Sequence, residues 1–515
     1  MTAFVIVQVR FHDCILPPER VRREPGTLAI EGNDFTTFLQ TFDGPVTTFV
    51  PRRRRLAVMK TTLLTLILVA APCRIIAGNG ATENYVAHEW GTFTSVQGAD
   101  GILIPWNPLE TSKLPKFVYD WTKPGMNRLP SGVLNPGSKS AFVTLQRMET
   151  PVIYLYSETE RTVDVAVRFP QGLITEWYPQ ATEIGPSSFP PGHVATALDG
   201  WVRQAGLNPH LTFASLFGKK GVPDSRIHWT QLRVLPAKGH AELSKALPTD
   251  VAGSHYFAAR ETDAAFLRVN SSETGKPAEQ EKFLFYRGVA NFKAPLSVTM
   301  GGGGEEWFQL RNTGTAELRH LFILNVQSGK GEFTQVDRLS GGELRSIHLA
   351  GKPNRAPLQE AADQLSQQMK EALSREGLYE REATAMVKTW RESWFEEEGV
   401  RVIYTLPRAW ADEILPLTLD PKPRENVRVM VGRAEIIRPT TKWELLKQIV
   451  RYAEGDSAGK QQAITRVQGL RLGRFIQPAV QCVLGSHPSP EFSQAAWALL
   501  NAATKARDDK SLAAR

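Results

Sequence analysis

The chain has 515 residues, of which 42% are hydrophobic and 22% charged, a balance typical of folded proteins with two or three domains. The formal net charge is +8. Setting aside the eight arginines and six acids of residues 1–58, together with Lys60 and Arg74, leaves 51 basic and 47 acidic residues, a net of +4. So small an excess, spread along the chain, argues against a nucleic-acid-binding surface.

The N-terminal region carries a secretory signal that begins inside the chain. From Met59 the sequence reads MKTTLLTLILVAAPCRIIAGNGA, with a basic residue, a short apolar run and small residues suited to cleavage. We therefore interpret 59–80 as a signal peptide, and 1–58 as a mis-assigned start or a disordered extension. Two alternatives stay open: Arg54 and Arg55 resemble a weak twin-arginine signal, and Cys73 suggests a lipoprotein site, although Pro72 is unusual there.

The expected location is therefore periplasmic or extracellular, with no transmembrane span in the mature chain, because the apolar run is too short to cross a bilayer. Removal of the leader would also remove Cys14 and Cys73, leaving Cys482 alone. A disulfide framework and a cysteine-based zinc site are then excluded. The ten histidines show no close ligand pair, and no phosphate loop or nucleophile elbow is present. The sequence therefore predicts no metal and no cofactor.

Residues 82–350 read as a series of strands separated by Gly, Pro and Asn clusters. The segment 162–169 alternates well, with Val163, Val165 and Val167 on one face and charged residues on the other. Similar segments, rich in branched and aromatic residues, occur at 141–147, 151–156, 228–235, 282–286 and 317–326. Many short strands without intervening helices predict a mainly β protein with an antiparallel β-sandwich-like body.

A helical hairpin is predicted at 356–396. Apolar residues recur at helical spacing on both sides of Gly377, and the second stripe ends in Trp390 and Trp394. The two tryptophans are interpreted as core residues rather than as a ligand platform. Strands resume at 400–406 and 427–437, so we expect 81–440 to form one β-rich body into which the hairpin is inserted.

The C-terminal part is predicted to be a small all-α domain. Four short amphipathic helices occupy 443–452, 460–468, 472–483 and 491–503. Two helical hairpins in series resemble a HEAT-type stack, although two units are fewer than such arrays normally need. Residues 441–507 are therefore expected to form either a helical cap or HEAT-like hairpins that dock a protein partner.

The most distinctive segment is Tyr85-Val-Ala-His-Glu-Trp-Gly-Thr. In a strand, His88 and Trp90 face one way and Glu89 the other, so His88 and Glu89 could not hold one metal without a bulge. Glu89 beside aromatic rings could act as a general acid or base. The alternative is that both polar residues hydrogen-bond within the core. Gly91 predicts a bulge or a close backbone approach.

Further polar residues lie among apolar neighbours and could line a sugar-binding cleft, in which rings stack on the sugar and charged groups hydrogen-bond to it. The predicted catalytic residues are His88, Glu89 and Glu176, and the predicted ligand-binding residues are Trp90, Trp177, Arg260 and Arg287. Glu149, Glu261 and Asp263 share the pattern. The competing interpretation makes each a member of a buried ion pair or a strand-end residue.

Five segments resemble those of a group of exported, uncharacterised bacterial proteins. They are AHEWGTFTSVQGADG (87–101), METPVIYLYS (148–157), GLITEWYP (172–179), FLFYRGVANF (283–292) and GLYEREATAMVKTWRESWFEEEG (377–399). The resemblance covers most of 82–440 and implies export and a single β-rich body that includes the hairpin. It transfers no catalytic residue.

The expected function is binding or processing of an envelope or extracellular polymer such as carbohydrate. This rests on analogy, from aromatic and acidic residues on a secreted β scaffold. Whether the protein is an enzyme is left open. The alternative is a non-catalytic structural or interaction protein that uses its C-terminal helices to dock a partner.

Overall fold

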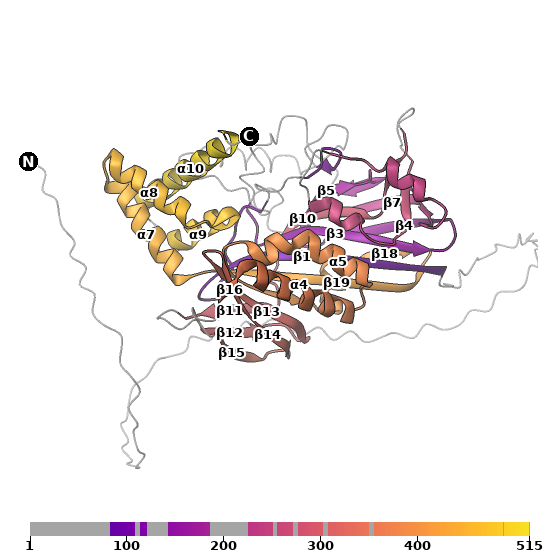
Figure 1. Cartoon of the computed structure of the whole chain (residues 1–515), viewed down its shortest axis with the longest axis horizontal. Coiled ribbons are helices and arrows are strands. Elements are labelled where there is room, and N and C mark those ends of the chain that lie inside the picture. The colour runs from indigo at the N-terminus through magenta and orange to yellow at the C-terminus, as the bar shows by residue number, and fades with distance from the viewer. Residues whose placement is uncertain are drawn as a thin grey trace, which may run out of the picture. The chain divides into compact units, whose positions relative to one another are not determined.

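The structure is a computed structural model, and its described residues all belong to one compact unit, Ile76–Arg515 (Figure 1). It describes residues 83–108, 114–120, 143–185, 225–250, 255–270, 277–301, 307–349, 355–487 and 489–513. The expected extension 1–58 and the expected signal peptide 59–80 lie outside the described residues.

A ten-stranded sheet forms the centre of the body. In order across the sheet, its strands are β16 (Ala356–Pro357), β14 (Lys330–Leu339), β13 (Leu318–Gln327), β17 (Gly399–Thr405), β19 (Pro423–Ile437), β1 (Glu83–Gly98), β3 (Gln146–Ser157), β10 (Leu284–Ala290), β5 (Gly172–Tyr178) and β2 (Tyr119–Asp120). Strands from both sides of the helical hairpin in the sequence thus belong to one sheet.

Two smaller sheets cover one face of the large sheet. The first contains β18 (Leu417–Asp420), β4 (Arg161–Arg168), β7 (Arg226–Leu235), β8 (Phe266–Val269) and β9 (Glu279–Glu281), with β6 (Glu183–Gly185) beside β7. The second contains β11 (Leu296–Met300), β12 (Trp307–Asn312) and β15 (Leu344–His348). Side chains from all three sheets share one core, in which Ile153 of β3, Val165 of β4 and Leu310 of β12 are fully buried. The mainly β, sandwich-like prediction is confirmed.

One strand pair departs from the antiparallel pattern. β1 pairs with β19 in parallel from Val86 opposite Glu425 to Gly98 opposite Ile437. Every other pair in the described sheets is antiparallel. Parallel neighbours need a long crossover connection, and here almost the whole body lies between the two strands.

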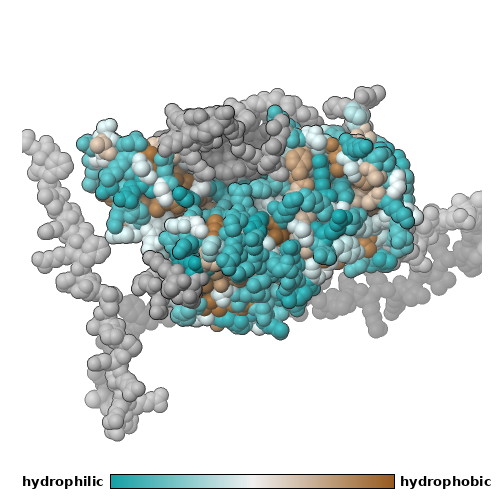
Figure 2. All heavy atoms as spheres, viewed as in Figure 1, coloured by the Kyte–Doolittle hydropathy of each residue, from teal (hydrophilic) through white to brown (hydrophobic). Residues whose placement is uncertain are grey.

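The predicted helical hairpin covers the opposite face of the large sheet (Figure 1). It consists of α4 (Leu358–Arg375), α5 (Glu380–Arg391) and the π-helical turn η4 (Glu392–Glu396). Gly377 has φ +108° between α4 and α5, a conformation that favours glycine. Trp390 and Trp394 are buried in the core between hairpin and sheet, as predicted. The outer surface of this region is mainly hydrophilic (Figure 2).

The C-terminal helices form at the predicted positions. They are α7 (Pro439–Glu454), α8 (Ser457–Gly469), the short η5 (Gly473–Phe475), α9 (Ile476–Leu484) and α10 (Pro490–Ala513). Their apolar faces share a core with Val96 of β1 and with Trp106 and Ile437. Removing these helices would therefore expose part of the body. Among the described helices, none combines the length and apolar character needed to cross a membrane.

Three short helices complete the described body. They are η1 (Ala241–Ala246), η2 (His255–Arg260) and α6 (Arg408–Ile414). The helix η2 packs against α5, and α6 packs against β19. Both therefore lie beside the polar residues that the sequence singled out.

Candidate functional site

Strand β1 sends His88 and Glu89 to opposite faces of the large sheet, as the alternation predicts. His88 and Trp90 point towards the helical hairpin, whereas Glu89 points towards the smaller sheets. The register with β3 shifts between Trp90 and Thr92. A Cβ atom on Gly91 would lie only 3.0 Å from the Cα of Pro151, so the predicted bulge and close approach are both present.

On the hairpin side, His88 forms a buried dyad with Glu382 of α5. The Nδ1 atom of His88 lies 2.7 Å from Oε2 of Glu382, and the two side chains are 1% and 0% exposed. The Tyr156 hydroxyl donates to Oε1 of Glu382 at 2.8 Å, and the Tyr379 backbone N–H donates to Oε2 at 2.8 Å. The rings of Tyr379 and Tyr156 contact the imidazole, with centroids 4.4 and 5.5 Å from it.

The hydrogen-bond network shows which groups donate to Glu382. Burial, reinforced by the charge of Glu382, raises the pKa of the Tyr156 hydroxyl far above its usual value, so this hydroxyl keeps its proton and donates it. The Glu382 carboxylate therefore accepts from Tyr156 and from the Tyr379 N–H. Nδ1 of His88 therefore donates a hydrogen bond to Glu382. Within the described residues, Nε2 is buried and has no hydrogen-bond partner.

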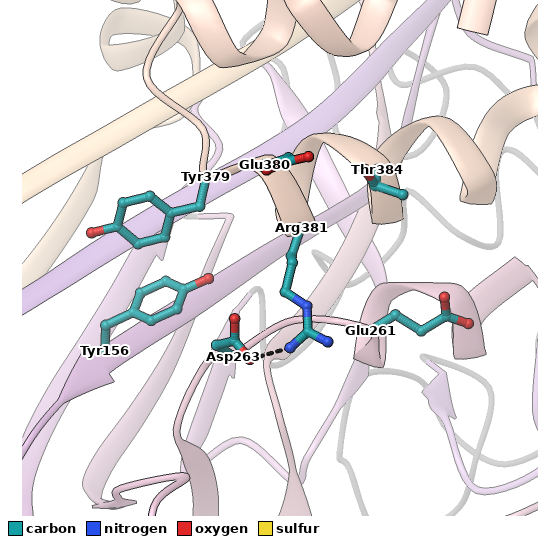
Figure 3. A pocket seen from close by; sticks show the side chains of 7 residues that line it. All are labelled: Tyr156, Glu261, Asp263, Tyr379, Glu380, Arg381 and Thr384. Carbon is teal, nitrogen blue, oxygen red and sulfur yellow. Dashed lines mark hydrogen bonds and ion pairs between the residues drawn. The ribbon is translucent and has the colours of Figure 1, made fainter. Parts of the chain in front are cut away.

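A surface pocket of about 800 Å³ lies beside this dyad (Figure 3). Its lining consists of Tyr156, Glu261, Asp263, Tyr379, Glu380, Arg381 and Thr384. The Tyr156 and Tyr379 rings meet edge to face with centroids 4.9 Å apart, and Tyr379 is 44% exposed. The same two tyrosines thus contact both the His88 ring and the pocket.

Charged side chains form the opposite wall of the pocket. Arg381 is paired with Asp263, and Figure 3 shows this ion pair below the tyrosines. Glu261 accepts a bond of 2.5 Å from Lys388, in an exposed pair. Exposed ion pairs of this kind contribute little to stability. These side chains are therefore available for hydrogen bonds to a ligand.

Glu89, a predicted acid or base, lies on the other side of the sheet in a closed ionic network. Its carboxylate accepts hydrogen bonds from Nε of Arg428 and from the Tyr286 hydroxyl. Arg428 also bonds to Asp412 at 2.7 Å and to the Leu415 carbonyl at 2.6 Å. Glu89 is 0% exposed. This position fits a buried ion-pair member, the competing interpretation of the sequence.

Glu176 and Arg287, two further predicted site residues, bind each other. Arg287 donates to both carboxylate oxygens of Glu176, at 2.8 and 2.9 Å, in the bidentate geometry that arginine favours. Both side chains are buried, at 4% and 7% exposure. They belong to a row of buried charges that crosses the large sheet beyond the end of the hairpin.

Arg260 lies in an aromatic cluster at the edge of the large sheet, whereas Trp177 belongs to the core that the three sheets share. Arg260 donates to Glu281 at 2.6–3.2 Å and lies 4.9 Å from the centre of the Phe257 ring. Trp177 is buried and stacks at 6.3 Å on Tyr119. Trp90 is likewise buried, in the core beneath the hairpin. The predicted residues therefore do not converge on one cleft, and their catalytic or binding roles stay predictions.

Sequence reasoning missed the partners that complete the dyad, namely Glu382, Tyr156 and Tyr379. Glu382 is the third residue of α5, the position from which a glutamate can reach back to a helix N-terminus, and this signal was available. Its distance of 294 residues from His88 made the pairing invisible to periodicity. In the described part of the chain, no group of three or more His, Cys, Asp or Glu side chains could hold a metal ion.

Comparison with known proteins shows no family. No family model matches the chain, and no curated protein matches it significantly. A solved structure of the yeast delta-COP-I mu-homology domain complexed with a WxWxV peptide is similar at 6% identity and a TM-score of 0.24, covering 69% of this chain and 98% of that chain. The same domain without peptide gives 7% identity, a TM-score of 0.23 and the same coverage. Scores this low support no functional statement.

Proposed function

We propose that this is an exported protein that binds a polar polymer, such as carbohydrate, in the pocket beside Tyr379. The observation that carries the proposal is an exposed tyrosine ring and a half-buried one facing carboxylate and guanidinium groups across the pocket. Sugars are recognised by this combination, because rings stack on their C–H faces and polar groups bind their hydroxyls.

The charge balance of the pocket disfavours an acidic ligand. Three carboxylates line it, those of Glu261, Asp263 and Glu380, against the single guanidinium of Arg381. An acidic polysaccharide would meet a like charge there, which disfavours binding. Binding of a neutral polymer should also depend only weakly on ionic strength, because the contacts involve few net charges.

The pocket is tested by replacing its exposed ring. In Tyr379→Ala, the affinity of the full-length mature protein for a neutral glucan should fall by about tenfold or more, the usual result of truncating an aromatic anchor. Affinity is measured by titration against the glucan and against an acidic polyuronate. The matched control is Trp443→Ala, which removes a ring that is 58% exposed on α7 and should leave glucan binding unchanged. Equal glucan affinity in Tyr379→Ala and wild type would overturn the proposal.

Processing of the polymer is a second candidate, favoured by the unpartnered Nε2 of His88. A histidine oriented by a carboxylate is a common general base. Glu89 and Glu176 fit this role less well, since arginines already occupy their oxygens. If His88 is the base, His88→Asn should abolish release of sugar fragments while glucan binding persists, and Glu89→Gln should not. No fragment release by wild type on any neutral polymer would remove this candidate.

The alternative role, docking of a protein partner, rests on the exposed face of α7. Trp443 is 58% exposed and Val450 is 39% exposed, one heptad apart on the same helix. In that case Trp443→Ala should weaken binding of the protein partner, and Tyr379→Ala should not. Export rests on the leader sequence alone, and N-terminal sequencing should find a mature end near Ala81.

A further inference from the structure

A row of mostly buried charged side chains crosses the hairpin face of the large sheet, beyond the end of the hairpin. We call it the charged row. It comprises Glu176, Arg287, Arg147, Glu149, Arg433, Glu435 and Arg401 from the strands, Glu397 after η4, and Arg474 from η5. Five arginines thus face four glutamates.

Among the described residues, every member of the charged row except Arg147 has an ionic partner at hydrogen-bonding distance. Arg287 binds Glu176, and Arg474 binds Glu149 at 2.9 Å. Arg433 binds Glu397 at 2.7 Å and Glu435 at 2.8 Å, and Arg401 binds Glu435 at 3.0 Å. The four acids are therefore already engaged.

Arg147 is the remaining cation. It is 4% exposed, and within the described residues its Nε atom has no hydrogen-bond partner. Burial lowers the pKa of Arg147 to about 10, against the opposing effect of nearby Glu149, so the group stays charged at neutral pH. Glu149 attracts this charge, but its carboxylate is hydrogen-bonded to Arg474. A buried charge with no hydrogen-bonded counter-charge is costly.

Other unpartnered donors lie beside Arg147. Register places Thr94 of β1 between Arg147 of β3 and Arg433 of β19 on the same face, and Thr92 opposite Glu149. In the described structure, the Thr92 hydroxyl and Nε of Arg433 are buried without partners. The unpartnered groups are N–H and O–H groups, each of which can donate to an acceptor.

We propose that this part of the charged row is a binding site for a small inorganic anion, held by Arg147 with donors from Thr92 and Arg433. An anion held between side chains of adjacent strands must be small, of about chloride size, because neighbouring strands lie close together. The anion neutralises the one excess positive charge. This site lies on the hairpin face of the large sheet. It does not depend on the function proposed for the pocket.

The test is thermal unfolding of the mature protein in sodium chloride, sodium phosphate or sodium gluconate, with ionic strength held constant by gluconate. Chloride should raise Tm in a saturable way, by about 4 °C at a hundredfold excess over Kd, because an anion that binds only the folded state stabilises it. Gluconate is too large for the site and should give no rise. A rise with phosphate but not with chloride would contradict a site of chloride size.

Arg147→Met should abolish the chloride effect while retaining most of the packing of the arginine stem. The matched control Arg345→Met, at a half-exposed arginine paired with Glu343, should keep it. Should Arg147→Met fail to fold, bromide bound to wild-type crystals must give an anomalous peak within hydrogen-bonding distance of Arg147. Identical Tm values in chloride and gluconate, an undiminished rise in Arg147→Met, or no bromide peak would each refute the site.

Discussion

Replacing Arg428 by Met should lower the free energy of unfolding by about 3–5 kcal/mol, the usual cost of removing one partner from a buried ion pair. Arg428 and Glu89 are 1% and 0% exposed, and the substitution would leave the carboxylate without its cation in the core. It would also leave the Leu415 carbonyl without its donor. Urea unfolding followed by fluorescence measures the change.

A double-mutant cycle tests whether Glu89 and Arg428 stabilise the fold as a pair. Glu89→Gln alone should cost less than Arg428→Met, because the amide is uncharged and still accepts from the Tyr286 hydroxyl. The cycle uses Arg428→Met, Glu89→Leu and the double variant with both changes. The double variant should lose much less stability than the sum of the two single variants, since both charges are then gone. Additive losses in the double variant would show that the two side chains are not coupled.

Acid should destabilise the protein through Glu149. Burial alone would raise the pKa of this carboxyl, but the attraction of Arg474 and Arg147 outweighs it and lowers the pKa from 4.5 to about 2. A carboxyl whose pKa is lower in the folded state contributes stability above pH 4.5 and loses it as the pH falls from 4.5 towards 2. A shift of this size corresponds to about 3 kcal/mol.

Glu149→Gln should therefore be less stable than wild type at pH 7, and its stability should change less between pH 4.5 and pH 2. Urea midpoints measured at half-unit intervals of pH give both curves. Glu261→Gln is the control, because Glu261 is 54% exposed and its pairing with Lys388 contributes little. If wild type and Glu149→Gln lose stability in parallel on acidification, the salt bridge to Arg474 does not hold the carboxyl ionised.

Local patterns in the sequence predicted much of the secondary structure. Alternating apolar and polar residues predicted strand β4, and apolar residues at helical spacing on either side of Gly377 predicted the hairpin. The opposite orientations of His88 and Glu89 followed from the two-residue period of a strand. These features depend on neighbours within a few residues, which periodicity records.

The partners of those residues could not be predicted in this way. His88 meets Glu382 from α5, Glu89 meets Arg428 from β19, and Glu149 meets Arg474 from η5, each more than 290 residues away. Alternation placed Arg428 on the strand face opposite Val427, Val429 and Val431. Which acid it would bind depended on the parallel pairing of β1 with β19.

The sequence by itself determined a β-rich body, an inserted hairpin and four C-terminal helices, because each is set by the spacing of apolar residues along a short segment. Only the tertiary structure decided that the predicted site residues lie in separate networks, and that two tyrosines join His88 to a surface pocket. The order of the strands and the packing of helices on the sheet bring charges together that lie far apart in the sequence. The strand order is set by the packing of the whole body rather than by any local pattern.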